Sequence, residues 1–297
     1  MPNILLLANL NCDRVLQLNK PLTTGGRHHY DDMGRRLGGG GANTGLGLLF
    51  AGHNVSLVSQ IGNDKTSDWL LAEASLRGLD CSLLQRNDLL TPELLLIMTP
   101  DGERTIIRPN RPLFILEQAP DFTLWDVLYI NSSAVNADIW AKTALEYTLV
   151  VAQLAKDERC RPCHILITSQ SDIAGRYDKD NNSKNSAAIW QYGQQIAGPQ
   201  LRYFIVTDGE NGATAYNQDR SLPIPAVTTE VVDTTGAGDA FASGLIHALL
   251  EEKEITEAMT QGAYWAAIAV ATDSSIPGEA LQNYLAKSYR SDNSRST

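Results

Sequence analysis

Short apolar runs alternate with stretches of helical spacing along most of this chain. The apolar runs that predict buried strands are residues 3–9, 55–61, 126–130, 148–151, 164–167 and 203–206. Residues 42–52 predict a helix that ends at Gly52, and residues 66–78 predict another helix. Strands that alternate with helices in this rhythm are typical of βαβ units, so the pattern predicts an α/β fold built around a parallel sheet.

Two segments of β character interrupt this rhythm. Residues 14–37 are more polar and carry a turn signal at Thr23–Gly26. Residues 93–99 and 103–108 lie on either side of Pro100–Gly102 and predict a β-hairpin. Together the two interruptions predict a small second sheet beside the main one.

Length and charge narrow the class of protein. The chain has 297 residues, enough for one large α/β domain or two smaller ones, and its net charge is −10. That charge argues against a general nucleic-acid or anionic-membrane surface. The first apolar run is short and lacks a basic flank, and no apolar stretch reaches the roughly 18 residues of a membrane span. We therefore expect a soluble, cytoplasmic protein with a polar loop at residues 178–186 and a disordered tail at residues 288–297.

The cysteines do not indicate a disulfide-stabilised fold or a redox or metal site. Four cysteines in a chain of this length do not make a disulfide scaffold. Cys160 and Cys163 form a C-x-x-C pair, but no second pair accompanies them. We interpret the pair as incidental, because a lone C-x-x-C is a weak signal for a redox or metal site.

The most informative segment lies near the C-terminus, at residues 233–250. Its apolar residues repeat with helical spacing and predict a helix from near Ala237 to about Glu252. Gly236, Ala237 and Gly238 therefore stand at a helix N-terminus, where backbone N–H groups lack partners and the helix dipole is positive. Glycines let a ligand approach this backbone closely, so the segment predicts a site for an anion or a phosphate.

Asp239 falls in the first turn of that helix, where the dipole favours its ionised form. A carboxylate beside a bound phosphate suits a catalyst that holds a substrate hydroxyl in line with phosphorus and takes its proton. A structural interpretation stays open, because acidic residues also favour first turns of ordinary helices. Other phosphate motifs are absent: the sequence contains no Gly-Lys pair, no His-Arg-Asp or Asp-Phe-Gly, and no G-x-G-x-x-G at residues 38–47.

Two motifs together resemble a known family. Residues 233–241, Asp-Thr-Thr-Gly-Ala-Gly-Asp-Ala-Phe, look like the C-terminal signature of the ribokinase-like (PfkB-type) carbohydrate kinases. Residues 38–43, followed by a helix and then residues 58–64, resemble the N-terminal signature of that family. The similarity spans about residues 3–285. It implies a single kinase domain over residues 1–297, with a Rossmann-like three-layer fold and a small β-sheet lid made from about residues 14–37 and 91–112.

The resemblance also implies roles on the phosphate side. Asp239 would be the base, and the Gly236, Ala237 and Gly238 N–H groups would form the anion hole. Asp233 and Thr235 match positions where the family often holds a monovalent cation such as K⁺. The residues that match the nucleotide segments of the family are Thr207, Gly209, Gly212 and Ser274.

On the substrate side, Asn11 and Asp13 match the Asn-x-Asp that grips sugar hydroxyls in this family. Carboxylate oxygens accept several hydroxyl hydrogen bonds, which suits a polyol. Asn43 matches an asparagine that contacts the same ligand, and Gly39 belongs to the expected lid hinge. Each has a structural alternative, since Asp13 is also a turn-capping residue type and Asn43 a helix-capping one. Arg108 is either a contact to an acidic or phosphorylated sugar or a solvated lid arginine.

The chain departs from the family pattern in two places. The Asn-x-x-Glu that organises Mg²⁺ is missing, and Asp172 in Ser169–Asp172 is the nearest equivalent. Gly40 stands where ribokinases proper carry a lysine, which weakens the case for ribose as the substrate.

These motifs predict ATP-dependent phosphotransfer to a primary hydroxyl of a sugar or related polyol, with Mg²⁺ bridging the phosphates. A nucleoside kinase of the same fold and a catalytically weak sugar-binding sensor are the alternatives. The expected partner is a small-molecule sugar, with no nucleic acid and no membrane. Open edges of a lid sheet also make a homodimer through the lid an expectation.

Overall fold

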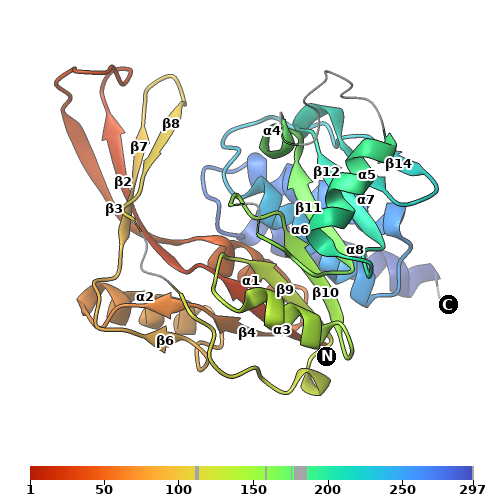
Figure 1. The fold of residues 1–297 in the computed structure, drawn as a ribbon. Coiled ribbons are helices and arrows are strands. Elements are labelled where there is room, and N and C mark those ends of the chain that lie inside the picture. The colour runs from red at the N-terminus through yellow and green to blue at the C-terminus, as the bar shows by residue number, and fades with distance from the viewer. Residues whose placement is uncertain (111–113, 158, 175, 177–185, 296–297) are drawn as a thin grey trace.

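A computed structural model describes residues 1–110, 114–157, 159–174, 176 and 186–295 (Figure 1). Eight strands of these residues form the main sheet. In sheet order they are β14 (Ser221–Ile224), β13 (Ala213–Tyr216), β12 (Tyr203–Thr207), β11 (Ile165–Ser169), β10 (Leu149–Gln153), β9 (Val127–Asn131), β1 (Asn3–Ala8) and β4 (Asn54–Val58). The pairs from β4 to β12 are parallel, and β13 and β14 add on antiparallel. The predicted parallel sheet is confirmed.

Helices cover both faces of this sheet. On one face they are α1 (Gly40–Phe50), α2 (Lys65–Leu76), α6 (Ala237–Leu250) and α7 (Ile255–Val270), with α8 (Glu279–Arg295) packed outside them. On the other face they are α3 (Ala137–Ala144), α4 (Gln170–Ile173) and α5 (Ser186–Ala197). Two short 3₁₀ turns are η1 (Phe122–Leu124) and η2 (Gly209–Asn211). The result is the expected three-layer α/β fold.

Strand β1 shows why the sheet needs both layers. Its side chains alternate between the two cores, with Ile4 and Leu6 on the α1 face and Leu5 and Leu7 on the α3 face. All four side chains are fully buried. A strand that is apolar on both faces is stable only when helices cover both, which is the usual state of a parallel sheet.

A second sheet stands apart from the main one, and we call it the lid sheet. Its strand order is β3 (Tyr30–Gly38), β2 (Asn11–Leu18), β7 (Glu93–Met98) and β8 (Arg104–Ile107). Strand β2 runs antiparallel to β3 and parallel to β7, which in turn runs antiparallel to β8. A minor pair, β5 (Gln60–Ile61) and β6 (Gln85–Arg86), lies near its base. Both predicted β interruptions therefore supply strands of one sheet.

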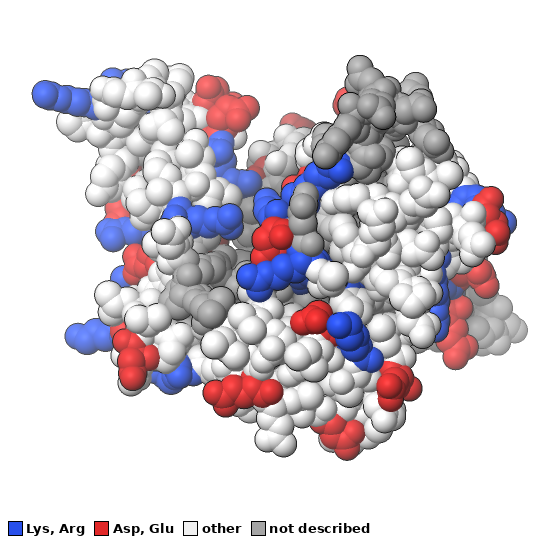
Figure 2. Space-filling view, viewed as in Figure 1, with Lys and Arg blue, Asp and Glu red and all other residues white. Residues whose placement is uncertain are grey.

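The lid sheet and the larger lobe leave a notch between them (Figure 2). Lys and Arg side chains stand on both sides of this notch, although the chain as a whole carries a net charge of −10. The carboxyl ends of the parallel strands are where such α/β sheets commonly bind ligands.

Close helix packing fixes where α6 begins. A Cβ on Gly244 of α6 would lie 2.9 Å from the backbone of Gln261 and Gly262 on α7. A Cβ on Gly47 of α1 would lie 3.3 Å from the side chain of Ser243 on α6. Helices without side chains at their crossing points approach closely and have little freedom to slide. The N-terminus of α6 is therefore held in a defined position at the edge of the sheet.

One prediction was wrong. The tail at residues 288–297 was expected to be disordered, but α8 continues to Arg295. Leu281 and Leu285 at the start of α8 pack against Trp265, and this anchorage lets the polar end of the helix continue. The predicted polar loop at 178–186 lies outside the described residues except for Ser186, which begins α5. None of the helices among residues 1–110, 114–157, 159–174 and 186–295 combines the length and apolar character of a membrane span.

His247 of α6 forms a buried pair with His53. His53 Nε2 and His247 Nδ1 are 3.0 Å apart, and the His247 ring stacks on Trp265 with 5.5 Å between ring centroids. Burial lowers the pKa of His53 to about 4, and the nearby His247 adds to this shift. Burial also lowers the pKa of His247 to about 4.

These pKa values predict acid-sensitive stability. An unfolded histidine titrates near 6.5, so below that pH the unfolded chain binds more protons than the folded one. The free energy of unfolding should therefore fall as the pH drops from about 6.5 towards 4. Urea unfolding across this range should show a shallower pH dependence for His247→Leu than for the wild type. The exposed His29→Leu variant should keep the wild-type slope, and an equal slope in all three proteins would contradict this account.

Candidate active site

Three distant segments meet at the carboxylate of Asp239, in the first turn of α6. Asn43 of α1 donates from Nδ2 to Oδ2 of Asp239 at 2.9 Å. Asn131, at the carboxyl end of β9, donates from Nδ2 to Oδ1 at 2.8 Å. Each carboxylate oxygen thus accepts one amide hydrogen bond, which fixes the plane of the carboxyl group.

The surroundings of Asp239 push its pKa in two directions. Burial raises the pKa, and the hydrogen bonds from Asn43 and Asn131 oppose that rise. Burial is the larger effect, so the pKa lies above its ordinary value. The sequence had suggested only that the helix dipole favours ionisation. A carboxylate with a raised pKa is a stronger base when ionised, which suits proton abstraction.

The loop before α6 bends sharply at Gly236, where φ is +76°. This left-handed conformation favours glycine, and a Cβ there would also lie within 3.2 Å of Ser275 and Asn43. The Ala237 N–H donates to Thr234 O at 3.3 Å, so this predicted anion-hole donor already has a partner. Gly238 borders open space, and its N–H lies in a first turn, where the helix supplies no acceptor. The geometry therefore leaves Gly238 better placed than Ala237 to meet an anion.

A lid arginine braces this loop. Arg104 of β8 forms an ion pair from Nη1 to Oδ1 of Asp233 at 2.7 Å, with 19% and 11% of the two side chains exposed. The same Oδ1 accepts from the N–H of Thr235 at 2.8 Å and from its hydroxyl. Oδ2 of Asp233 is buried without a hydrogen-bond partner in the described part of the chain. The loop and the lid sheet are thus tied together through Asp233.

The predicted substrate residues line the adjoining edge. A Cβ on Gly38 would clash with the Asp13 carboxylate, and one on Gly39 would lie 3.0 Å from the Asn11 amide. Gly39 also has a φ of +85°, a conformation that favours glycine. These contacts bring Asn11, Asp13 and Gly39 together at the junction of the lid sheet and α1.

Gly40 joins this edge to Asp239. A Cβ at Gly40 would clash with the Asn131 amide and lie 3.3 Å from Oδ1 of Asp239. The absence of a side chain at position 40, where the resembled kinases carry lysine, leaves the space that Asn131 occupies. Asn11, Asp13, Gly39, Asn43 and Asp239 therefore lie in one continuous site.

The other predicted residues form no hydrogen bond with Asp239 within the described part of the chain. Thr207 is the last residue of β12, Gly209 begins the η2 turn, and Gly212 comes directly after that turn. Asp172 is exposed in α4, and its backbone N–H bonds Ser169 Oγ. Arg108 is exposed just past the end of β8, rather than on the strand as expected.

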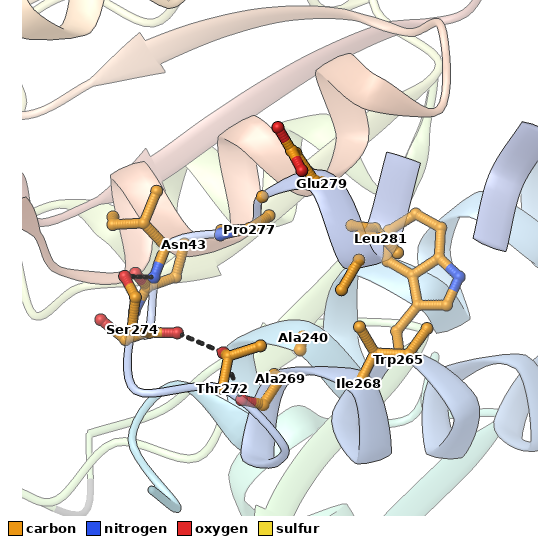
Figure 3. Close-up of a pocket in the computed structure, with 14 residues that line it drawn as sticks. Asn43, Ala240, Trp265, Ile268, Ala269, Thr272, Ser274, Pro277, Glu279 and Leu281 are labelled. Atoms are coloured by element: carbon orange, nitrogen blue, oxygen red, sulfur yellow. Dashed lines mark hydrogen bonds between the residues drawn. The ribbon is translucent and has the colours of Figure 1, made fainter. Parts of the chain in front are cut away.

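Ser274 borders a cavity of about 220 Å³ between α6, α7 and the start of α8 (Figure 3). Asn43 lies at one side of this cavity, and Trp265 and Leu281 lie at the other. Thr207, Gly209 and Gly212 are not among its lining residues. The predicted nucleotide residues are therefore divided between this cavity and the end of β12.

Sequence reasoning missed two residues of the site, Asn131 and Arg104. Asn131 is the first residue after the predicted strand 126–130, and polar residues at the ends of parallel strands are candidates for binding sites. The position of Asn131 at a strand end could therefore have identified it as a candidate site residue. The ion pair of Arg104 with Asp233 spans 129 positions and could not be read from local pattern.

Comparison with known proteins decides the family. The sequence profile of the pfkB family carbohydrate kinases matches residues 1–280. The chain belongs to the pfkB family of carbohydrate kinases. It is 23% identical to a probable fructokinase of Arabidopsis thaliana in an alignment of 290 positions that covers 84% of this chain and 83% of the relative.

Solved structures share the pfkB fold over nearly the whole chain. A ribokinase from Thermotoga maritima superposes with a TM-score of 0.80 at 22% identity, covering 97% of this chain and all of that one. An Arabidopsis thaliana ribokinase complexed with ribose and ATP gives 0.77 at 18% identity, covering 96% and 99%. The family assignment makes this pfkB member a carbohydrate kinase, as the two motifs predicted.

The Asn131 amide offers a direct test of how the site tunes Asp239. Asn131→Ala removes a hydrogen bond that lowers the pKa of Asp239, so that pKa should rise further. The acid limb of the pH profile of kcat/KM should then move to higher pH, with turnover reduced by about tenfold or more. The exposed Asn54→Ala variant serves as control. An acid limb that stays in place or moves to lower pH would contradict this assignment.

The Arg104–Asp233 pair predicts a link between the lid sheet and the loop. Arg104→Gln should leave residues 234–238 less constrained, and their amide hydrogen exchange should quicken by about tenfold. Arg14→Gln, which removes a more exposed ion pair from the lid sheet, should leave exchange in that loop unchanged. Equal exchange in the wild type and Arg104→Gln would show that the pair does not hold the loop.

Proposed function

We propose that this carbohydrate kinase transfers the γ-phosphate of ATP to a primary hydroxyl of a sugar or related polyol. Asp239 is the base, and the backbone at 236–238, chiefly the Gly238 N–H, is the anion hole. One observation carries the proposal: the Asp239 carboxylate stands between the N-terminus of α6 and the edge formed by Asn11, Asp13 and Gly39. A hydroxyl gripped at that edge and a phosphate at the helix N-terminus would meet at Asp239.

Asp239 takes the proton of the attacking hydroxyl in this proposal. Burial raises the pKa of Asp239, so its ionised carboxylate binds a proton more strongly than the carboxylate of an exposed aspartate does. The amides of Asn43 and Asn131 hold both oxygens in a fixed plane, so the base needs no reorientation during the reaction. Gly238 offers its first-turn N–H, which faces open space, to the transferred phosphoryl group.

ATP as donor is supported by the Thr207–Gly212 and Ser274 segments and by the ATP complex of the Arabidopsis ribokinase. The acceptor side is supported by Asn11, Asp13 and Asn43. Asp13 is almost fully buried, with its carboxylate beside Gly38, and a buried carboxylate favours hydrogen-bond donors such as substrate hydroxyls.

The residues at the two predicted metal positions, Asp172 for Mg²⁺ and Asp233 with Thr235 for a monovalent cation, offer different ligands. The described residues contain no group of three or more acidic, histidine or cysteine side chains that could hold a metal ion. Mg²⁺ that accompanies the nucleotide would therefore be held chiefly by phosphate oxygens and water, with Asp172 as the nearest predicted carboxylate, and would neutralise phosphate charge. The unpartnered Oδ2 of Asp233, beside Thr235, suits a monovalent cation such as K⁺.

The lid sheet also supports the proposed homodimer. Its outer strands β3 and β8 each have one edge without a strand partner among the described residues. An open edge of this kind pairs readily with a second copy. Sedimentation at increasing protein concentration would show whether the dimer forms.

Substitution of the base tests the proposed chemistry. Asp239→Asn keeps the size of the side chain but cannot take a proton, so sugar-dependent ADP release should fall by about 10²–10⁴-fold. Sugar-induced thermal stabilisation should persist, because the contacts at Asn11 and Asp13 remain. A panel of sugars and nucleosides should be used in both assays. Undiminished turnover by Asp239→Asn would remove Asp239 as the base, and ligand stabilisation without any turnover by the wild type would favour a sensor.

A further inference from the structure

The two faces of the lid sheet carry arginines in different surroundings. Asp13, Arg36 and Leu94 stand in register across β2, β3 and β7, so their side chains lie on one face. Arg14 and Arg35 form the next pair in register and lie on the opposite face. The lid sheet thus has an Asp13 face with Arg36 and a second face with Arg14 and Arg35.

The Asp13 face is the one that meets the candidate active site. Gly38 lies two residues beyond Arg36 on β3, and the Asp13 carboxylate fills the side of Gly38 where a Cβ would stand. A Cβ on the neighbouring Gly39 would lie 3.0 Å from the Asn11 amide, and one on Gly40 would lie 3.3 Å from Oδ1 of Asp239. Arg36 therefore shares its face with the proposed substrate grip rather than with the outer surface of the lid sheet.

The arginines of the second face both have carboxylate partners. Arg14 pairs with Asp32 at 2.5 Å, and Arg35 pairs with Glu93. Their side chains are 40% and 43% exposed, so water also solvates these charges. These guanidinium groups need no ligand to be satisfied.

Arg36 differs from Arg14 and Arg35 in both its hydrogen-bond partners and its burial. Its Nε and Nη2 are buried and have no hydrogen-bond partner within the part of the chain that the structure describes. No carboxylate of the described residues forms an ion pair with Arg36. A guanidinium keeps its charge at every physiological pH, and burying its N–H groups without acceptors is unfavourable.

Arg104 repeats this pattern further along the same face. Register with Met98 of β7 places it on the Asp13 face, and its Nε is also buried with no acceptor among the described residues. Its Nη1 is already engaged by Asp233. The face that meets the active site thus carries two guanidinium groups with unused buried donors, and Figure 2 shows Lys and Arg side chains on both sides of the notch that it borders.

We infer that the acceptor substrate carries an anionic group, a carboxylate or a phosphate, and that Arg36 binds it. The inference rests on the proposed phosphotransfer function and names the substrate class of the same site. Two parallel donors of a guanidinium match two oxygens of an oxyanion, so the unused Nε and Nη2 form a ready fork. Asp13, across the strand pair, grips hydroxyls of the same molecule. The donor phosphates belong to the N-terminus of α6, so Arg36 serves the acceptor.

Matched acceptors test this inference. Glucitol and gluconate differ by one carboxylate, and fructose and fructose 6-phosphate differ by one phosphate, while each of the four keeps a free primary hydroxyl. ADP release and thermal stabilisation should be measured for all four with the wild type. At least one anionic compound should exceed its neutral counterpart by about tenfold or more in kcat/KM, and should stabilise the protein more. The pair that shows the preference tells carboxylate from phosphate.

Variants of adjacent residues assign the effect to Arg36. Arg36→Gln should abolish the preference for the anionic compound, mainly through KM, while leaving the neutral compound within about threefold. Arg35→Gln, on the opposite face, is the matched control and should keep the preference. Arg36→Lys keeps the positive charge but lacks the paired guanidinium donors, so it should lose part of the preference for the anionic compound. This variant also tests the inference if Arg36→Gln does not fold.

The outcomes separate the two proposals. Neutral compounds that match or exceed their anionic counterparts in both assays overturn the inference and leave the kinase function standing. A preference that survives in Arg36→Gln and Arg36→Lys also overturns it. Stabilisation by the anionic compounds that depends on Arg36, without ADP release by the wild type, supports the anionic pocket and contradicts the phosphotransfer function.

Discussion

The pair of amide hydrogen bonds to Asp239 is the interaction on which the rest of the site depends. Asn43 and Asn131 lie 196 and 108 positions away from Asp239 in the chain, yet each donates to one of its oxygens. A buried carboxylate without such donors would be neutralised or would destabilise the fold. With the two amide donors, Asp239 keeps a fixed orientation as a hydrogen-bond acceptor. Burial still raises its pKa above the ordinary value. Orientation and basicity of the proposed base therefore come from the same three side chains.

The fold makes this meeting possible through close packing. Asn131 is placed by the end of β9, and Asn43 by the first turn of α1, beside the carboxyl end of β1. Asp239 is placed by α6, which the glycines at α6–α7 and α1–α6 contacts hold close to its neighbours. A larger side chain at Gly244 would separate α6 from α7 and move Asp239 relative to both amides. The tertiary packing thus sets atomic distances within the site.

Sequence pattern predicted much of this arrangement and missed specific parts. The parallel sheet, the lid sheet and the helix at Asp239 followed from local periodicity and glycine positions, which report on neighbouring residues. Asn131 and Arg104 were missed because their roles arise from contacts across the fold. Even Arg36 had no signal in the sequence, since only the strand register separates it from Arg35. The end of α8 was mispredicted because its anchorage on Trp265 is also a tertiary contact.

The protonation of Asp239 is the most direct test of the central claim. Carboxyl-carbon NMR of aspartate-labelled protein, with the Asp239 signal assigned by its loss in Asp239→Asn, would give the pKa of this group. The account predicts that it titrates above the ordinary aspartate value of about 3.9, at the pH where phosphoryl transfer in a single turnover falls off. Titration at or below that ordinary value, or an acid limb that persists in Asp239→Asn, would contradict Asp239 as the buried base.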